Sequence, residues 1–436
     1  MARKRLRLAQ RRKAVGLSQE SLAEVVGVDR STVVRWERAD TEPQPWHRPK
    51  LAQVLRVSIE ELSSLLADVV DIRPDVMPDV PEISSVSQWS TVATDAAGAD
   101  HGRRTLLQAI AAVAAASGLL GGHLPKGSRC LGATDVARLN AVTTLYRSVD
   151  YEWGGGLLHT YVAQFAESTS ALLSQKYTDA LRPDLFAAVA AARQLAGWTA
   201  FDSCRYADGQ RHFLSAERVA LAADNVLLAA RIRYCQARQF QHLRHNQDAL
   251  ETLRLAQDQL GQRTTPAVAA MLSGAEGASL AALGDRSAAQ AALSAADQAF
   301  DQIRSEREPD WMRFYDRGEL LAQHGRVYRD FARSDKRHGQ AAVHWVREAL
   351  PAYGAQNVRS TVLSEVSLCS ALFLADEPDQ ALAVGWRTLN RAGHLTSPRI
   401  FDRIRNLRRD LTQHRQLPEV AAFARELAAI RPASTL

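Results

Sequence analysis

Residues 18–38 constrain the fold of this chain more than any other segment. Apolar residues recur at helical spacing on either side of Gly27, which predicts two short helices joined by a tight turn. Because glycine enters the left-handed conformation at little cost, the first helix is expected to end there. The side chains expected to pack between the two helices are Leu22, Ala23, Val28, Val33 and Trp36.

Both predicted helices begin at residues that favour helix starts. Ser18 precedes the first helix and can accept a hydrogen bond from an unpaired backbone N–H group. Ser21 stands where a full capping box would have Glu, so half of that motif is missing. Asp29 is the expected N-cap of the second helix, where its charge also favours the positive end of the helix dipole.

The second helix leaves a polar face outward. Its outward residues are Arg30, Ser31, Thr32 and Arg35, and such side chains can read base edges in a DNA major groove. Seven lysines and arginines also precede the first acidic residue of the chain, Glu20. That opening is the charge pattern of a phosphate-binding surface, so these features together indicate a DNA-binding module.

Residues 3–66 as a whole resemble the Cro/C1 (XRE) class of helix-turn-helix domain. The likeness includes the basic stretch 5–16, the phrase Gly16-Leu-Ser-Gln-Glu-Ser-Leu-Ala23 and the closing segment 51–62. It implies an all-α, five-helix, repressor-like DNA-binding domain at residues 1–67 with double-stranded operator DNA as its partner.

The resemblance also implies roles for individual residues. In that class the Gln matching Gln19 touches phosphate and a base-contacting neighbour, and positions matching Arg30, Ser31 and Arg35 face base edges. The full set of expected DNA contacts is Gln19, Arg30, Ser31, Thr32, Arg35, Arg5 and Lys50.

Three further residues are expected to hold the head together. The resemblance implies a buried ion pair between Arg12 and Glu37. Trp36 is expected in the core, because it shares an apolar face with Val33. The following loop, residues 40–47, is acidic at its start where relatives often carry glycine and basic residues, so phosphate contacts from it are not expected.

Length and composition bound the rest of the chain. A chain of 436 residues is too long for one compact helical domain, and its net charge is +6. Its four cysteines lie far apart, which favours no disulfide scaffold or metal knuckle and fits a reducing cytoplasm. The N-terminal residues are basic and contain no apolar run, so no signal peptide is expected. The predicted location is the cytoplasm, at the nucleoid.

Two segments separate the head from the rest. Residues 68–102 are acidic and rich in Pro and Ser, which predicts a linker. Residues 103–122 begin with Arg103-Arg104 and continue as an Ala-rich stretch that superficially resembles a twin-arginine export signal. Because this stretch is interrupted by Gln108 and Ser117, a helix packed on the downstream domain is favoured over membrane association, and no stable membrane insertion is expected.

Residues 134–430 repeat one helical pattern about every forty residues. A small residue is followed four positions later by a bulky apolar one, and three positions after that by Ala. This spacing resembles the packing of tetratricopeptide repeats, and it predicts an α-solenoid of helix pairs with a concave surface. The three clear units are Gly209/Phe213/Ala216, Ala249/Leu253/Ala256 and Ala289/Leu293/Ala296, with weaker echoes at Ala341/Trp345 and Ala381/Gly385.

The repeat register places several polar and aromatic residues on the concave side. Guanidinium groups there can clamp a carboxylate through paired hydrogen bonds, which suits a peptide end or an acidic protein partner. The predicted ligand residues are Arg231, Tyr234, Arg238, Gln241 and Trp198, with Phe201 in an equivalent place. The alternative is a helical scaffold that serves only dimerisation.

Other signals indicate no chemistry. Gly154-Gly-Gly-Leu157 lacks the Lys-Ser/Thr of a phosphate loop and is interpreted as a turn. His242 and His245 have a possible metal spacing but no third ligand. No catalytic motif is present, so neither an enzyme nor a cofactor is predicted.

The layout resembles actinobacterial regulators, and high Ala and Arg usage suggests a GC-rich genome. It also resembles the peptide-sensing regulators of Gram-positive bacteria, which pair the same head with such repeats. We therefore predict a transcriptional regulator that binds a pseudo-palindromic site as a homodimer and senses a peptide or protein. The alternative is a repeat scaffold or antagonist in which the head is an auxiliary tether.

Overall fold

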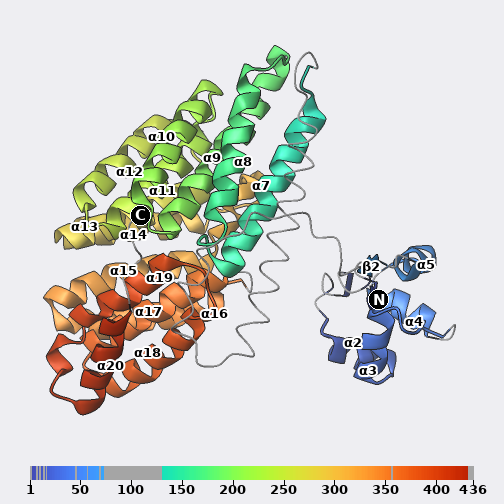
Figure 1. The fold of residues 1–436 in the computed structure, drawn as a ribbon. Coiled ribbons are helices and arrows are strands. Elements are labelled where there is room, and N and C mark those ends of the chain that lie inside the picture. Colours follow the sequence, from blue (N-terminus) through green and yellow to red (C-terminus); the bar gives the residue numbers. More distant parts are fainter. Residues whose placement is uncertain are drawn as a thin grey trace. The chain divides into compact units, whose positions relative to one another are not determined.

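The structure is a computed structural model, and its described residues form two compact units, a head up to residue 72 and a repeat domain from residue 130 (Figure 1). The described residues are 2–5, 8, 11–12, 15, 17–44, 47–55, 57–67, 70–72, 130–354 and 357–430. The Ala-rich helix predicted at residues 103–122, and all of the predicted linker except residues 70–72, lie outside them.

The head has the predicted helical architecture. Its helices are α2 (Gln19–Val26), α3 (Arg30–Glu37), α4 (Arg48–Leu55) and α5 (Ile59–Ala67). Leu8, Arg11 and Arg12 also have helical backbone. The apolar core that these elements share includes Leu22, Ala23, Val33, Trp36, Leu51, Leu55 and Leu62, with Val28 half-buried against it.

The turn between α2 and α3 forms as the sequence predicts. The Ser18 hydroxyl accepts a hydrogen bond from the backbone N–H of Ser21 at 2.9 Å. Gly27 ends α2 in the left-handed region, with φ of 85°. Asp29 is the N-cap residue of α3, although its side chain makes no capping hydrogen bond.

Two short strands add to the helical head. Strand β1 (Ala2–Lys4) pairs antiparallel with β2 (Val70–Ile72), and Arg3 lies opposite Asp71. Because β2 falls inside the range predicted as linker, the folded head continues beyond residue 67. Strands of three residues are too short to leave a periodic signal in a sequence, which explains why the pattern did not reveal them.

The repeat domain is a stack of antiparallel helix pairs. Its α-helices are α7 (Ala133–Trp153), α8 (His159–Ser170), α9 (Arg182–Asp202), α10 (Tyr206–Ala222), α11 (Val226–His242), α12 (Asn246–Leu260), α13 (Pro266–Leu283), α14 (Arg286–Phe300), α15 (Arg317–Ser334), α16 (Gly339–Ala352), α17 (Val358–Leu374), α18 (Pro378–Ala392), α19 (Pro398–Arg405) and α20 (Pro418–Ala429). The short 3-10 helices are η2 (Ala171–Ser174), η3 (Asp179–Leu181), η4 (Gly261–Arg263), η5 (Ser305–Arg307), η6 (Asp310–Phe314), η7 (Lys336–His338), η8 (Asn406–Arg409) and η9 (Thr412–His414).

The predicted small–large–Ala pattern marks the second helix of each pair. Helices α10, α12 and α14 carry its three clear units, and each of the nine pattern residues is buried. Small residues let a helix approach its partner closely, and the bulky residue fills the gap between the turns. A Cβ added at Gly209 would lie 2.7 Å from the side-chain oxygen of Gln239, which shows how tight this approach is.

The fourth unit differs by one residue from the prediction, whereas the fifth has the predicted register. In α16 the buried triad is Ala342, Val346 and Ala349, one residue later than the predicted pair Ala341/Trp345. The Ala341-Ala342 doublet left both registers open in the sequence. In α18 Gly385 replaces the bulky residue because the Phe423 ring of α20 occupies that space, 2.5 Å from where a Cβ would stand.

The stack closes on itself, because α7 packs against α17 and α9 against α19. Arg359 of α17 donates to Asp150 of α7 at 2.5 Å, and Arg399 of α19 donates to Asp202 of α9 at 3.0 Å. Both carboxylates are fully buried. Burial raises the pKa of Asp150. At Asp202 burial is outweighed by Arg359 and Arg399, which lower its pKa.

The glycine run at residues 154–156 belongs to this closure. The Gly155 N–H donates to Asp202 at 2.9 Å, and the Thr396 N–H donates to the Trp153 carbonyl at 2.8 Å. A Cβ at Gly156 would lie 1.8 Å from the Thr396 carbonyl oxygen. The segment is the predicted turn, and its lack of side chains also lets the two ends of the solenoid meet.

Helix α13 is long and apolar enough to cross a membrane by length and composition. However, 67% of its apolar window is buried inside the repeat domain, where it packs against α12, α14 and α15. It is therefore interpreted as a core helix of the solenoid.

Replacement of Phe213 by Ala is expected to destabilise the repeat domain by about 3–5 kcal/mol, because it leaves a cavity where a fully buried ring fills the gap between α9 and α10. The neighbouring Leu214→Ala removes a side chain that is 55% exposed and should have little effect. Urea unfolding followed by circular dichroism compares the two variants, and equal losses would contradict the repeat register.

Candidate functional site

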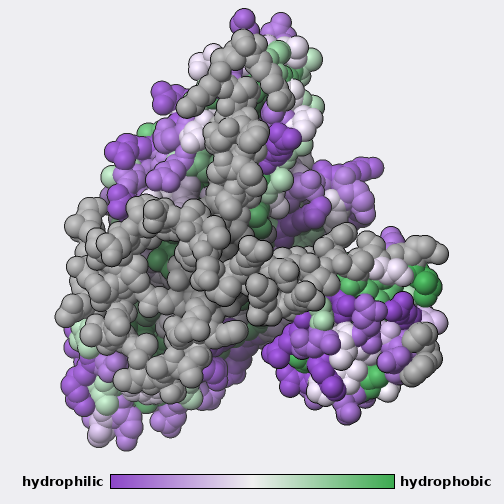
Figure 2. All heavy atoms as spheres, turned by 45° about the vertical axis from the view of Figure 1, so that its right-hand side comes forward, coloured by the Kyte–Doolittle hydropathy of each residue, from purple (hydrophilic) through white to green (hydrophobic). Residues whose placement is uncertain are grey.

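Helix α3 presents one polar face from a well-anchored position. Val33 and Trp36 are 1% and 3% exposed in the head core, whereas Arg30, Ser31 and Arg35 are exposed and Thr32 is half-buried. Within the head, no described side chain covers the guanidinium of Arg35, whose one hydrogen bond returns to the Ser31 carbonyl of its own helix at 3.4 Å. Figure 2 shows that much of the visible surface of the head is hydrophilic.

A buried polar network holds the end of α3. Arg12 Nε donates to Glu37 Oε1 at 2.7 Å, and Gln19 Nε2 donates to Glu37 Oε2 at 2.6 Å. Arg12 and Glu37 are the pair that the family resemblance implied, and both side chains are buried. Gln19 opens α2 and is tied to this pair, so its amide links the start of one helix of the motif to the end of the other.

Arg5 and Lys50 lie in contrasting surroundings. Lys50 is exposed on α4. Arg5 is 4% exposed, and its guanidinium donates to the carbonyls of Leu66, Trp36 and Thr41. The structure therefore uses Arg5 to tie the head together instead of offering it to phosphate, which corrects the expectation from the basic N-terminal run.

The acidic loop after α3 neutralises nearby cations. Glu42 accepts from Arg5 at 3.3 Å and from Arg48 at 3.0 Å. Arg48 also donates to the Pro43 carbonyl at 3.1 Å. This geometry gives a physical reason why the loop is a poor phosphate ligand.

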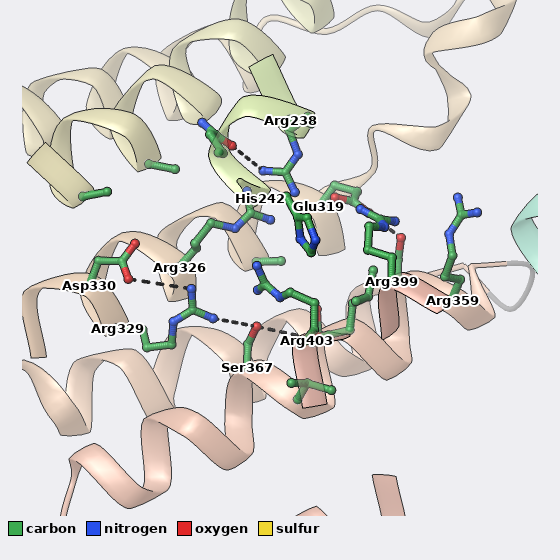
Figure 3. A pocket seen from close by; sticks show the side chains of 18 of the residues that line it. Arg238, His242, Glu319, Arg326, Arg329, Asp330, Arg359, Ser367, Arg399 and Arg403 are labelled. Atoms are coloured by element: carbon green, nitrogen blue, oxygen red, sulfur yellow. Dashed lines mark hydrogen bonds and ion pairs between the residues drawn. The ribbon is translucent and has the colours of Figure 1, made fainter. Parts of the chain in front are cut away.

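The interior of the repeat domain holds a cavity of about 580 Å³ (Figure 3). It is lined by the inner helices of the stack, α7, α9, α11, α13, α15, α17 and α19. All five ligand residues predicted from the repeat register, Arg231, Tyr234, Arg238, Gln241 and Trp198, lie on its wall. Phe201 does not, because its ring is fully buried in the helix packing.

Two of the predicted residues, Arg231 and Gln241, are fixed by backbone carbonyls. Arg231 donates to the Trp311 carbonyl at 2.5 Å and stacks over the Phe314 ring. Gln241 Nε2 donates to the Ala275 carbonyl at 2.7 Å. Arg238 is freer: it donates to Gln241 Oε1 at 2.9 Å and lies 5.9 Å from the Tyr234 ring centre.

Sequence reasoning missed the opposite wall of the cavity. That wall carries arginines of α15, α17 and α19: Arg326, Arg329, Arg333, Arg359, Arg399 and Arg403. The spacing of Arg326, Arg329 and Arg333 puts them on one helical face, so an extended repeat register would have found them. Helix α19 follows no repeat pattern, and its arginines left no such signal.

Burial and mutual repulsion act on the arginines of this wall. Burial, followed by the charges of Arg329 and Arg238, lowers the pKa of Arg403 to about 9. Burial likewise lowers the pKa of Arg329. Such a cluster is chemically suited to bind anions, since it remains largely protonated at neutral pH but lacks enough counter-charge.

The histidine pair considered as a metal site is divided between two environments. The side chain of His242 is 6% exposed, with Nε2 3.0 Å from the Tyr206 hydroxyl and 3.1 Å from Asp402 Oδ2. His245 precedes α12 at the surface, 3.6 Å from Asp248. The two side chains therefore belong to different surroundings and do not form a common site.

Comparison with known proteins identifies the head. Residues 8–62 match the helix-turn-helix family model, so this region is a helix-turn-helix domain, as the Cro/C1 resemblance implied. No curated protein matches the chain. Among solved structures it is similar to Bacillus thuringiensis PlcR, which was crystallised with the peptide PapR7 and DNA, at 15% identity over 68% of this chain and 94% of that one. The TM-score is 0.28, so the two chains do not superpose as a whole. The peptide and the DNA are partners of PlcR.

We expect Glu37→Ala to destabilise the head by about 3–5 kcal/mol, because it leaves the Arg12 guanidinium buried without its partner. Glu24→Ala, which removes an exposed carboxylate of α2, is the matched control. A double variant, Arg12→Met with Glu37→Met, should recover most of the loss. Thermal unfolding measures all three, and a Glu37→Ala variant as stable as the control would show that the network is dispensable.

Proposed function

We propose that this protein is a sequence-specific DNA-binding transcriptional regulator, a proposal that proceeds from the helix-turn-helix domain at residues 8–62. The observation that carries it is the exposed face of α3, whose Arg30, Ser31 and Arg35 project from a helix fixed by Trp36 in the core. A rigid helix with outward arginines is suited to direct readout, because a guanidinium pairs with the O6 and N7 acceptors of guanine.

The contacts divide by chemistry. Arg30 and Arg35 read base edges, and Ser31 and Thr32 supplement them. Lys50 and Gln19 contact phosphate, which fixes the register of the head on the duplex. Arg5 is left out of this set because its donors are satisfied inside the head.

A single head offers few base contacts, so the regulator binds a pseudo-palindromic operator as a homodimer formed through the repeat domain. This function is binding, not catalysis, and it is exercised in the cytoplasm at the nucleoid. The repeat domain senses a partner, a peptide, a protein or another molecule, whose anionic groups bind in the arginine-lined cavity.

Arg35→Ala is expected to weaken binding to the cognate operator by about 1–3 kcal/mol, since it removes a base contact without disturbing the core. The operator is first obtained by selection from random DNA with the full-length protein, and affinity is then measured by quantitative gel shift at fixed salt. Arg313→Ala removes an 84%-exposed guanidinium of the repeat domain and serves as the control. Equal operator affinity of the wild type and Arg35→Ala would count against α3 as the reading helix.

The second candidate is a scaffold or antagonist in which the head is an auxiliary tether. The size of the repeat domain and its own cavity favour it. Arg30→Ala combined with Arg35→Ala in the full-length protein separates the two functions. A regulator loses promoter control in a reporter assay, whereas a scaffold keeps its cellular effect.

A further inference from the structure

The cavity wall is strongly unbalanced in charge. It carries eleven arginines and only four carboxylates, those of Asp150, Glu319, Asp330 and Asp410. Asp150 pairs with Arg359, and both Asp330 and Asp410 pair with Arg333. Burial raises the pKa of Glu319, and its carboxylate accepts a hydrogen bond from Ser360 at 2.6 Å. The carboxylates of the wall therefore form ion pairs with only a few of its arginines.

Within the described part of the chain, seven of the eleven wall arginines form no ion pair with a carboxylate. They are Arg147, Arg231, Arg238, Arg244, Arg326, Arg403 and Arg409. Figure 3 shows Arg238, Arg326 and Arg403 converging on the same space from α11, α15 and α19. Arg326 Nη1 and Arg147 Nε are buried with no hydrogen-bond partner, and so is Nε of the neighbouring Arg329.

Unpaired buried donors of this kind are costly, and the acceptors that they lack are supplied by ordered water or by a ligand. A single carboxylate carries one negative charge, which is too little for the three converging guanidinium groups of Arg238, Arg326 and Arg403. Phosphate oxygens match the planar fork of arginine in pairs, and a diphosphate carries several charges in a compact volume.

The size of the cavity also bears on the ligand. A cavity volume of about 580 Å³ lies within the range of about 300–1,000 Å³ that is typical of small-molecule sites.

We propose that the cavity binds a small molecule bearing a diphosphate group, held by Arg238, Arg326 and Arg403 with Arg147 and Arg329 in support. This deepens the proposed function by naming the ligand class of the sensing cavity, and it rests on that cavity and not on the DNA-binding face. Because these arginines come from α11, α15 and α19, the ligand ties the two halves of the closed solenoid together and relieves their repulsion.

The test uses the full-length protein, with isothermal titration calorimetry and thermal unfolding in the absence of DNA. The probes are inorganic pyrophosphate, ADP, sodium sulfate at matched ionic strength, and a tetraglutamate peptide. The variants are Arg326→Gln, Arg403→Gln and their combination. The control is Arg304→Gln, which removes an exposed guanidinium whose hydrogen bond goes to the adjacent Ile303 carbonyl.

Pyrophosphate or ADP should bind the wild type and the control and raise Tm, and each cavity variant should weaken that binding about tenfold or more. The unliganded variants should unfold at the same or a higher temperature than the wild type, because they remove a buried charge from a repulsive cluster. That second readout separates lost binding from lost folding.

Three outcomes overturn the proposal: no binding of either diphosphate, equal effects of sulfate, or tighter binding of tetraglutamate, which would favour an acidic peptide. Because no DNA is present, a negative result here leaves the operator measurements with Arg35→Ala unaffected. Conversely, a loss of operator specificity would not alter the calorimetric result.

Discussion

The buried ion network that closes the solenoid is the constraint on which the repeat domain depends. Asp150 and Asp202 are fully buried, and Arg359 and Arg399 reach them from helices about two hundred residues further along the chain. Trp198 lies beneath both guanidinium groups, 5.5 and 5.2 Å from their central carbons. Breaking such a network leaves an unpaired charge buried in the interior. This cost in free energy favours the closed form over forms in which the ends separate.

Closure turns a concave surface into a cavity. An open solenoid would offer its inner helices to a long partner, whereas here α7 and α9 meet α17 and α19 and enclose the space. Closure also brings arginines of separate helix pairs close together. Arg238, Arg329 and Arg403 therefore repel one another. The ion network must outweigh this repulsion when no anion is present.

The sequence reveals local features of this structure far better than remote ones. The helix-turn-helix and the triads of α10, α12 and α14 were predictable because each signal lies within one or two helical turns. The α11 residues of the cavity followed from the register of a single repeat. The pairing of Asp150 with Arg359 was not predictable, since nothing in either local pattern specifies a contact across 209 positions. Arg5 was wrongly predicted to contact DNA, because a run of basic residues indicates charge but not which of its side chains are buried.

Sensing requires that a ligand bind two states of the protein with different affinity. In the closed ring the arginines of the cavity converge from α11, α15 and α19. If the proposed anion binds there, it should favour this closed form over any form in which these helices separate. The free energy available for signalling is bounded by that difference in affinity, and it increases with the number of guanidinium groups that separate on opening. A cluster left short of counter-charge is accordingly a costly feature in an inert scaffold and a useful one in a sensor.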